Sequence, residues 1–127
     1  MNLSGKAVKY WLDKEGIALE NMLVVVDEVA IPLNKIRIRP GGSSAGHNGL
    51  RSVEETLETT NYPRLRFGVG NTYPRGMQVE YVLGKWLNSE LPLVKLKLVK
   101  TVEAVETFIL AGLDTAMNQY NNLLISL

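Results

Sequence analysis

The run Met22–Val26 constrains the fold of this chain more than any other stretch. It is five consecutive apolar residues, the last three of them valine. A continuous apolar, β-branched run suits a strand that is covered on both faces, as in a parallel sheet between layers of helices. Helical patterns lie on both sides of the run, so we predict an α/β fold. The expected architecture is a single three-layer domain over residues 1–127, with a mixed, mainly parallel sheet flanked by helices.

Periodicity places the other elements. Three-and-four apolar spacing predicts helices at residues 4–16, 48–57, 91–110 and 114–120, and extended patterns predict strands at 35–39 and 64–70. Ser4 is expected to cap the first helix and Gly16 to end it. The long helix tolerates Pro92 in its first turn. Its predicted core side is Val94, Leu98, Val102, Val105 and Ile109.

Composition excludes several classes of protein. The chain has no cysteine and one histidine, which rules out a disulfide framework and a structural zinc site. No apolar run approaches the ~20 residues that span a membrane. Without a basic-then-apolar leader the expected compartment is the cytoplasm. The net charge is +1, so nucleic-acid binding would need a local basic patch.

The glycine-rich stretch from Arg37 to Leu50 is a candidate binding loop. Its four glycines are Gly41, Gly42, Gly46 and Gly49. Glycine lets the backbone turn sharply and approach a ligand, since no Cβ is present to clash. His47 and Asn48 follow at the start of a predicted helix, where free N–H groups attract anions. One open reading is a module that binds a phosphorylated small molecule here.

Asp27 is the leading catalytic candidate. It follows the buried strand at its carboxyl end, which is the edge where open α/β sheets bind ligands. From the residues alone, Asp27 and His47 form the one acid–base dyad that the chain can assemble. A structural alternative stays open for each residue: Asp27 as a turn cap, and His47 as a hydrogen-bonded structural histidine.

Basic residues cluster on the two polar strands and on the long helix. Arg37 and Arg64 are explained as solvated charges on edge strands, which discourage aggregation. Arg39 and Arg66 are candidates for binding phosphate, because guanidinium groups hold phosphate oxygens bidentately. Three lysines are expected on an exposed helix face: Lys95, Lys97 and Lys100.

Five short motifs, in order along nearly the whole chain, resemble bacterial peptidyl-tRNA hydrolases. They are Met-Asn-Leu-Ser-Gly at residues 1–5, Asp27-Glu28, Gly-His-Asn-Gly-Leu at 46–50, Arg-Leu-Arg-Phe-Gly-Val-Gly at 64–70 and Val-Leu-Gly-Lys at 82–85. The resemblance implies a cytoplasmic, cofactor-free carboxylic ester hydrolase of translation and ribosome rescue. Its substrate would be peptidyl-tRNA, whose peptide–tRNA ester it cleaves to recycle the tRNA.

The resemblance also assigns roles to individual residues. Asp27 matches the carboxylate that orients the family's catalytic histidine, and His47 matches a second histidine that assists binding. Asn2 and Asn48 match side chains that hold the substrate near the scissile ester. Arg39 and Arg66 match positions that grip the tRNA 5′-phosphate. No metal is implied.

The chain departs from the family pattern at its N-terminus. The family's first strand, its Gly-Leu-Gly-Asn-Pro-Gly loop and the segment with the catalytic histidine have no counterpart in the sequence. We therefore expect a domain without its N-terminal portion, through a deliberately shortened chain, a misassigned start or a gene fragment. Its activity is expected to be impaired. The family is usually monomeric, but loss of a central strand would favour self-association. A non-catalytic tRNA-binding remnant is the alternative.

Overall fold

The computed structural model describes residues 3–44, 46–70 and 86–127. These residues fall into two compact units. The first takes its described residues from Met1–Val26 and Arg39–Arg64, and the second from Asp27–Ile38 and Leu65–Leu127. Each unit is described by itself below. The single-domain organisation expected from the sequence stays a prediction.

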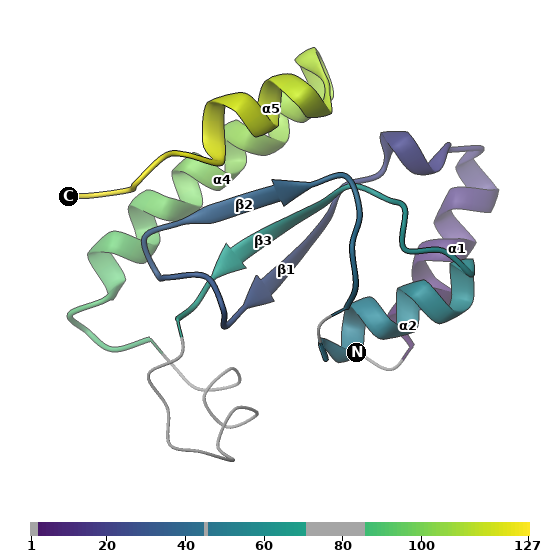
Figure 1. Cartoon of the computed structure of the whole chain (residues 1–127), viewed down its shortest axis with the longest axis horizontal. Coiled ribbons are helices and arrows are strands. Elements are labelled where there is room, and N and C mark those ends of the chain that lie inside the picture. Colours follow the sequence, from purple (N-terminus) through teal and green to yellow (C-terminus); the bar gives the residue numbers. More distant parts are fainter. Residues whose placement is uncertain (1–2, 45, 71–85) are drawn as a thin grey trace. The chain divides into compact units, whose positions relative to one another are not determined.

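The sheet is mixed and has three described strands. β1 (Val24–Glu28), β2 (Ile36–Arg39) and β3 (Arg64–Gly68) lie in the order β1-β3-β2. The arrows of β1 and β3 point the same way and that of β2 points the opposite way (Figure 1). A mixed sheet with flanking helices confirms the predicted α/β class.

One expectation about this sheet was wrong. β1 was predicted to be covered on both faces, but among the described strands it lies at the edge and Val25 is 51% exposed. A run of valines indicates a strand that favours apolar surroundings, but it does not indicate the position of that strand in the sheet. Which strand lies in the middle depends on how distant segments pair, and here β3 takes that place.

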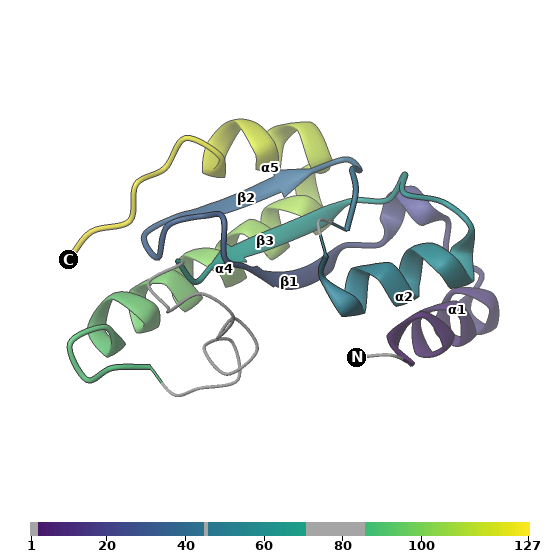
Figure 2. The ribbon, with the colours of Figure 1, turned by 60° about the horizontal axis from the view of Figure 1, so that its bottom comes forward.

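The first unit is built on two packed helices, α1 (Ser4–Glu15) and α2 (Asn48–Leu57), shown in Figure 2. The Gly5 N–H donates to Ser52 Oγ at 3.0 Å, and a Cβ on Gly5 would collide with the Ser52 carbonyl. A short 3-10 turn, Leu19–Asn21, leads from α1 towards β1. The core consists of buried residues and partly buried ones that pack on them: Leu50, Val53 and Tyr62 with Val8, Met22, Val24, Val26 and Leu57.

The two ends of α1 test the capping predictions. Gly16 ends the helix in the left-handed conformation at φ 62°, as predicted. Ser4, however, is the first helical residue rather than the cap. The N-cap is Leu3, which makes no side-chain capping bond. The helix therefore starts one residue earlier than serine's capping preference indicated.

In the second unit α4 (Leu91–Ala111) and α5 (Leu113–Tyr120) lie side by side, and α4 runs across one face of β2 and β3 (Figures 1 and 2). Pro92 is in its first turn, as expected. The buried stripe of α4 is Val94, Lys97, Thr101 and Ala104. The predicted core side was thus largely wrong: only Val94 is buried, whereas Leu98, Val102 and Ile109 are exposed.

The edge strand β2 shows the predicted alternation. Ile36 and Ile38 are fully buried, while Arg37 and Arg39 are exposed. The Asn121 amide after α5 makes two bonds to the backbone of this strand. It accepts from the Ile38 N–H at 2.6 Å and donates to the Ile38 carbonyl at 2.9 Å. Asn121 thereby satisfies backbone groups that an open edge would offer to another chain.

Within the described residues, no helix combines the length and the apolarity needed to cross a bilayer.

Candidate functional site

Asp27 lies where the sequence places it, as the penultimate residue of β1 at the strand's carboxyl end, and it is half-buried. The next residue, Glu28, forms an ion pair with Arg66 of β3, with 3.2 Å between Oε1 and the guanidinium nitrogen. The side chains of this pair are only 16% and 18% exposed. Glu28 therefore already has a cation at this end of the strand.

His47 is the N-cap of α2. Its Nδ1 accepts a hydrogen bond from the Leu50 N–H at 3.2 Å, which satisfies one of the free donors at the start of the helix. An accepting Nδ1 carries no proton, so the proton of the neutral imidazole is on Nε2. The imidazole therefore acts as a structural cap through Nδ1.

This capping bond limits what His47 can do chemically. A histidine base that a carboxylate orients donates one ring N–H to that carboxylate and accepts the substrate proton on the other nitrogen. In His47 the nitrogen that would accept the proton is engaged by Leu50. His47 cannot be held by Asp27 and take up a proton while it caps α2. The geometry argues against the simple dyad reading.

The predicted grouping of Asp27 with His47 and Asn48 spans the two units, because Asp27 belongs to the second and the other two to the first. That grouping stays a prediction. Asn48 itself is the first residue of α2 and is exposed. Asn2 and the motif at residues 82–85 lie outside the described residues.

The glycine-rich loop packs against another part of the same chain, the turn before β3. A Cβ on Gly41 would lie 2.9 Å from the Thr60 carbonyl, and the Gly42 N–H donates to the same carbonyl at 3.3 Å. Gly42 and Gly46 have φ values of 130° and 83°, which favour glycine. Together with the capped start of α2, this packing weakens the reading of the loop as a phosphate cradle.

The four arginines of β2 and β3 fall into three environments. Arg37 and Arg39 are exposed on β2, which leaves Arg39 accessible to phosphate at the end of the strand. Arg66 is largely buried beside Glu28. Arg64 was expected to be a solvated edge charge, and this was wrong. β3 is the central strand and Arg64 is fully buried in the first unit.

Arg64 is held by three neighbours of different chemistry. Its guanidinium is 3.4 Å from Glu54 Oε1, donates to the Thr60 carbonyl at 2.7 Å and stacks 4.2 Å from the centre of the Tyr62 ring. Alternating Arg-Leu-Arg residues gave no sign of this, because the partners come from α2 and the turn before β3.

Lys97 is the buried group that the sequence reasoning missed. It was expected on a solvated face of α4, but its side chain is fully buried. The ammonium group donates to the Gly68 carbonyl at the end of β3 and lies 3.8 Å from the centre of the Phe67 ring. Burial lowers the pKa of Lys97 from its ordinary 10.5 to about 7. The sequence did contain a sign of this burial, because Lys97 lies on the same face of the helix as the apolar residues Val94 and Ala104.

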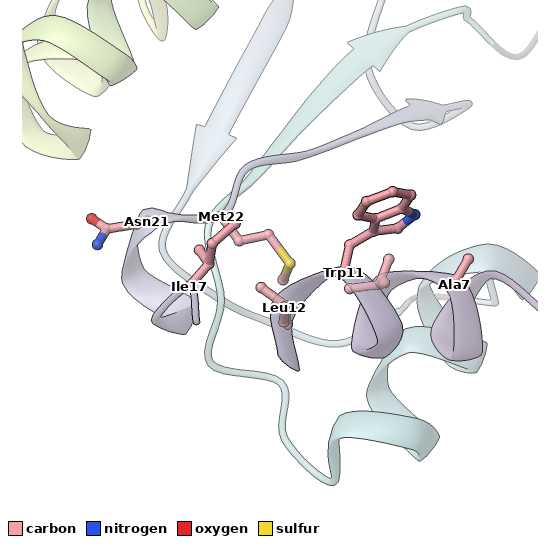
Figure 3. A pocket seen from close by; sticks show the side chains of 7 residues that line it. Ala7, Trp11, Leu12, Ile17, Asn21 and Met22 are labelled. Carbon is pink, nitrogen blue, oxygen red and sulfur yellow. The ribbon is translucent and has the colours of Figure 1, made fainter. Parts of the chain in front are cut away.

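An apolar pocket of about 310 Å³ lies in the first unit, against α1 (Figure 3). Seven residues line it: Ala7, Val8, Trp11, Leu12, Ile17, Asn21 and Met22. The amide of Asn21 points away from the sulfur of Met22 and the ring of Trp11. Of the predicted site residues that the structure describes, Asp27, Arg39, His47, Asn48 and Arg66, none lines this pocket. In the described parts of the chain, no three metal-ligating side chains gather.

Comparison with known proteins accounts for the motifs. A model of the peptidyl-tRNA hydrolase family matches residues 1–126. The chain belongs to the peptidyl-tRNA hydrolase family. It is 52% identical over 122 residues to the peptidyl-tRNA hydrolase of Parabacteroides distasonis, covering 96% of this chain and 65% of the relative. It is 48% identical over 121 residues to that of Bacteroides fragilis, covering 95% and 65%.

The structural comparison gives the same result. The crystal structure of the peptidyl-tRNA hydrolase from Acinetobacter baumannii superposes with a TM-score of 0.88 at 31% identity, covering 98% of this chain and 63% of that one. The chain therefore spans just under two thirds of the length of these bacterial relatives. The fold and the family expected from the sequence are confirmed.

Proposed function

We propose that these residues supply the tRNA-binding and histidine-orienting part of a peptidyl-tRNA hydrolase acting in the cytoplasm on peptidyl-tRNA. The family match over residues 1–126 carries this proposal. In the reaction, water attacks the ester carbonyl, its proton passes to a histidine, and the released hydroxyl of the tRNA takes a proton in return. Asp27 orients the histidine and stabilises its charged form.

The base in this mechanism is a histidine other than His47. The bond from the Leu50 N–H to Nδ1 supports this assignment, because it occupies the nitrogen that would have to receive the proton. His47 then assists binding next to Asn48 at the start of α2. Asn2 completes the substrate-positioning set. The 127 residues hold no other histidine, so on their own we expect binding without turnover.

Arg39 and Arg66 are the proposed contacts to the tRNA phosphate, and their environments suggest different contributions. Arg39 is exposed and can meet a phosphate without losing a partner. Arg66 is held in place by Glu28, which fixes its geometry and also competes for its charge. Arg39 therefore contributes more of the salt-dependent affinity.

The test combines tRNA binding with hydrolysis of an N-acetylated aminoacyl-tRNA. The chain is expected to bind tRNA with an affinity that falls steeply with salt, and Arg39→Met should lower the slope of log K against log salt by about 1. Arg37→Met removes another exposed charge from the same strand and is the matched control. Absence of binding at low salt, or equal effects of the two variants, would refute the role of Arg39.

Measuring turnover distinguishes a role of His47 as a helix cap from a role as the catalytic base. His47→Ala removes both the helix cap and the imidazole, whereas His47→Asn keeps a capping oxygen. If the 127 residues hydrolysed the substrate and both variants abolished turnover with α2 still folded, His47 would be the base and the assignment above would be wrong.

A further inference from the structure

The buried ammonium group of Lys97 binds the backbone of β3 at its carboxyl end. It donates to the carbonyl of Gly68, the last residue of the strand, and its Nζ lies 3.8 Å from the centre of the Phe67 ring. Both partners directly follow Arg66 in the sequence. Lys97 therefore connects α4 to the strand end that carries one of the proposed phosphate contacts.

The peptide group that Lys97 contacts is bonded through its nitrogen as well. Its N–H belongs to Val69 and donates to the Glu28 carbonyl, the last carbonyl of β1, at 3.0 Å. A charged donor on the oxygen of a peptide group polarises that group and strengthens the hydrogen bond that its N–H makes. The ammonium group therefore reinforces the link between the ends of β3 and β1.

Gly68 is also held from the loop between β1 and β2. Its N–H donates to the Lys35 carbonyl at 3.2 Å, and a Cβ on Gly68 would collide with the Pro32 carbonyl. The loop thus packs directly on the backbone that Lys97 contacts. Both polar groups of the Gly68 backbone have partners, and the described partner of its carbonyl is Lys97.

We propose that Lys97 is a positioning residue for the phosphate contact of Arg66, acting through the peptide group between Gly68 and Val69. Arg66 and its ion-pair partner Glu28 belong to the two strand ends that this peptide group joins. A firm link between these ends fixes the guanidinium before a phosphate binds, so less ordering is required on binding. This inference rests on the phosphate contact proposed above for Arg66.

The charge of Lys97 makes this link depend on pH. Burial lowers the pKa of Lys97 to about 7, so the charged donor is present at pH 6 and is lost at higher pH. None of the ion pairs described for this chain brings a carboxylate to Lys97. The charged groups of the neighbouring elements are ion pairs (Arg66 with Glu28, Lys100 with Glu103), exposed (Arg37, Lys95 and Asp114) or half-buried (Asp27 and Lys35).

The experiment measures the affinity for a 5′-phosphorylated tRNA at low salt, at pH 6 and at pH 9. Lys97→Met is compared with wild type, and the same pair is compared in the Arg66→Met background. We expect Lys97→Met to weaken binding about threefold at pH 6, as for coupled residues of one network. The loss should be absent at pH 9 and in the Arg66→Met background.

Thr101→Val is the matched control. It alters the same buried stripe of α4, but the hydroxyl that it removes bonds within the helix, to the Lys97 carbonyl at 2.8 Å. We expect it to leave the affinity unchanged at both pH values. A role of Lys97 in folding alone would lower the affinity at both pH values and in both backgrounds.

A spectroscopic measurement on the wild type does not depend on the folding of any variant. In nuclear magnetic resonance spectra, the carbonyl carbon of Gly68 and the amide of Val69 should titrate together with a midpoint near pH 7. The same signals of Lys97→Met should not titrate in this window. A Gly68 carbonyl that does not titrate in the wild type overturns the proposal.

The binding results also decide the proposal. A loss at pH 6 that is absent at pH 9 and absent without Arg66 supports it. An unchanged affinity of Lys97→Met at pH 6, an equal loss at both pH values, or a loss that persists in the Arg66→Met background overturns it and leaves the phosphate contact of Arg66 standing. If Arg66→Met itself leaves the affinity unchanged, that contact is refuted and this inference with it.

Discussion

Two fully buried cations, Arg64 in the first unit and Lys97 in the second, are held in different ways. Arg64 has a carboxylate, a carbonyl and an aromatic ring around it. Lys97 has a carbonyl and an aromatic ring, and none of the ion pairs described for this chain involves it. Both sites use the strand β3, which Arg64 begins and whose last residue, Gly68, accepts from Lys97.

The difference follows from the chemistry of the two side chains. A guanidinium stays charged in proteins, so its burial requires a counter-charge and enough acceptors for its forked donors. An amine can lose its proton, and burial lowers the pKa of Lys97 to about 7 instead. The arginine is therefore a fixed structural ion, whereas the lysine is a charge that titrates inside the fold.

The largest expected effect is that of Arg64→Met. It would leave Glu54, whose side chain is only 15% exposed, without its cation. Breaking a buried ion pair from one side costs about 3–5 kcal/mol. We expect the free energy of unfolding, measured by urea denaturation at pH 7, to fall by that amount. Arg37→Met, on the exposed side of β2, is the control and should change it by less than ~0.5 kcal/mol.

A small change in the free energy of unfolding of Arg64→Met would contradict this contrast between Arg64 and Lys97. Glu54 would then tolerate its partly buried site without a cation. The double variant Arg64→Met with Glu54→Gln sharpens it. If the pair is coupled, the double variant should recover part of the loss, since no uncompensated charge remains.

Lys97→Met should change the pH dependence of stability. The unfolded lysine binds its proton up to its ordinary pKa of 10.5, whereas the folded one releases it near 7. Between these values the unfolded state holds more protons, so the wild-type protein gains stability as the pH rises. The slope is at most ~1.4 kcal/mol per pH unit. Below pH 7 the full penalty of the buried charge is present.

The measurement is the free energy of unfolding of wild type and variant from pH 6 to pH 10. We expect the free energy of unfolding of Lys97→Met, relative to that of wild type, to be highest at pH 6 and to fall as the pH rises. Lys95→Met, an exposed lysine of the same helix, is the control and should show no such slope. Parallel curves for Lys97→Met and wild type would show that Lys97 does not titrate in this window.

The smallest loss of stability is expected for the ion pair of Arg66 with Glu28. This pair is less buried than Arg64 and Lys97. Its side chains keep partial access to solvent, so Glu28→Gln should cost only about 1 kcal/mol. The same change removes the competing Glu28 charge, and tRNA affinity at low salt should rise if Arg66 contacts a phosphate. Glu55→Gln, on the exposed side of α2, is the control. If Glu28→Gln lost as much stability as Arg64→Met, the Arg66–Glu28 pair would behave as a fully buried ion pair.

Local patterns predicted several parts of this structure well. The bounds of α2 match the prediction, because its apolar spacing and the turn residues before it agree. The alternation of β2 appears in its burial, and Gly16 ends α1 in the conformation that glycine tolerates. The five motifs identified the family. The placement of His47 at the start of a helix was also predicted, although its capping bond was not.

Predictions failed where the partners of a residue lie outside its own helix or strand. Arg64 and Arg66 are two residues apart on one strand, and only the first is fully buried, because α2 and the preceding turn supply Glu54 and Thr60. Apolar periodicity favoured the stripe of α4 that runs through Leu98 and Val102. The helix instead buries the stripe with Lys97, and the Gly68 carbonyl and the Phe67 ring receive its ammonium group.

By itself the sequence determined the family, the order of helices and strands, and the residue types available for chemistry, since these follow from local spacing and motif. Tertiary structure decided which strand is central, which face of α4 is buried, and which cations have partners. These outcomes depend on contacts between different elements of the chain. The free energy of a buried charge is set by the groups that such contacts bring to it.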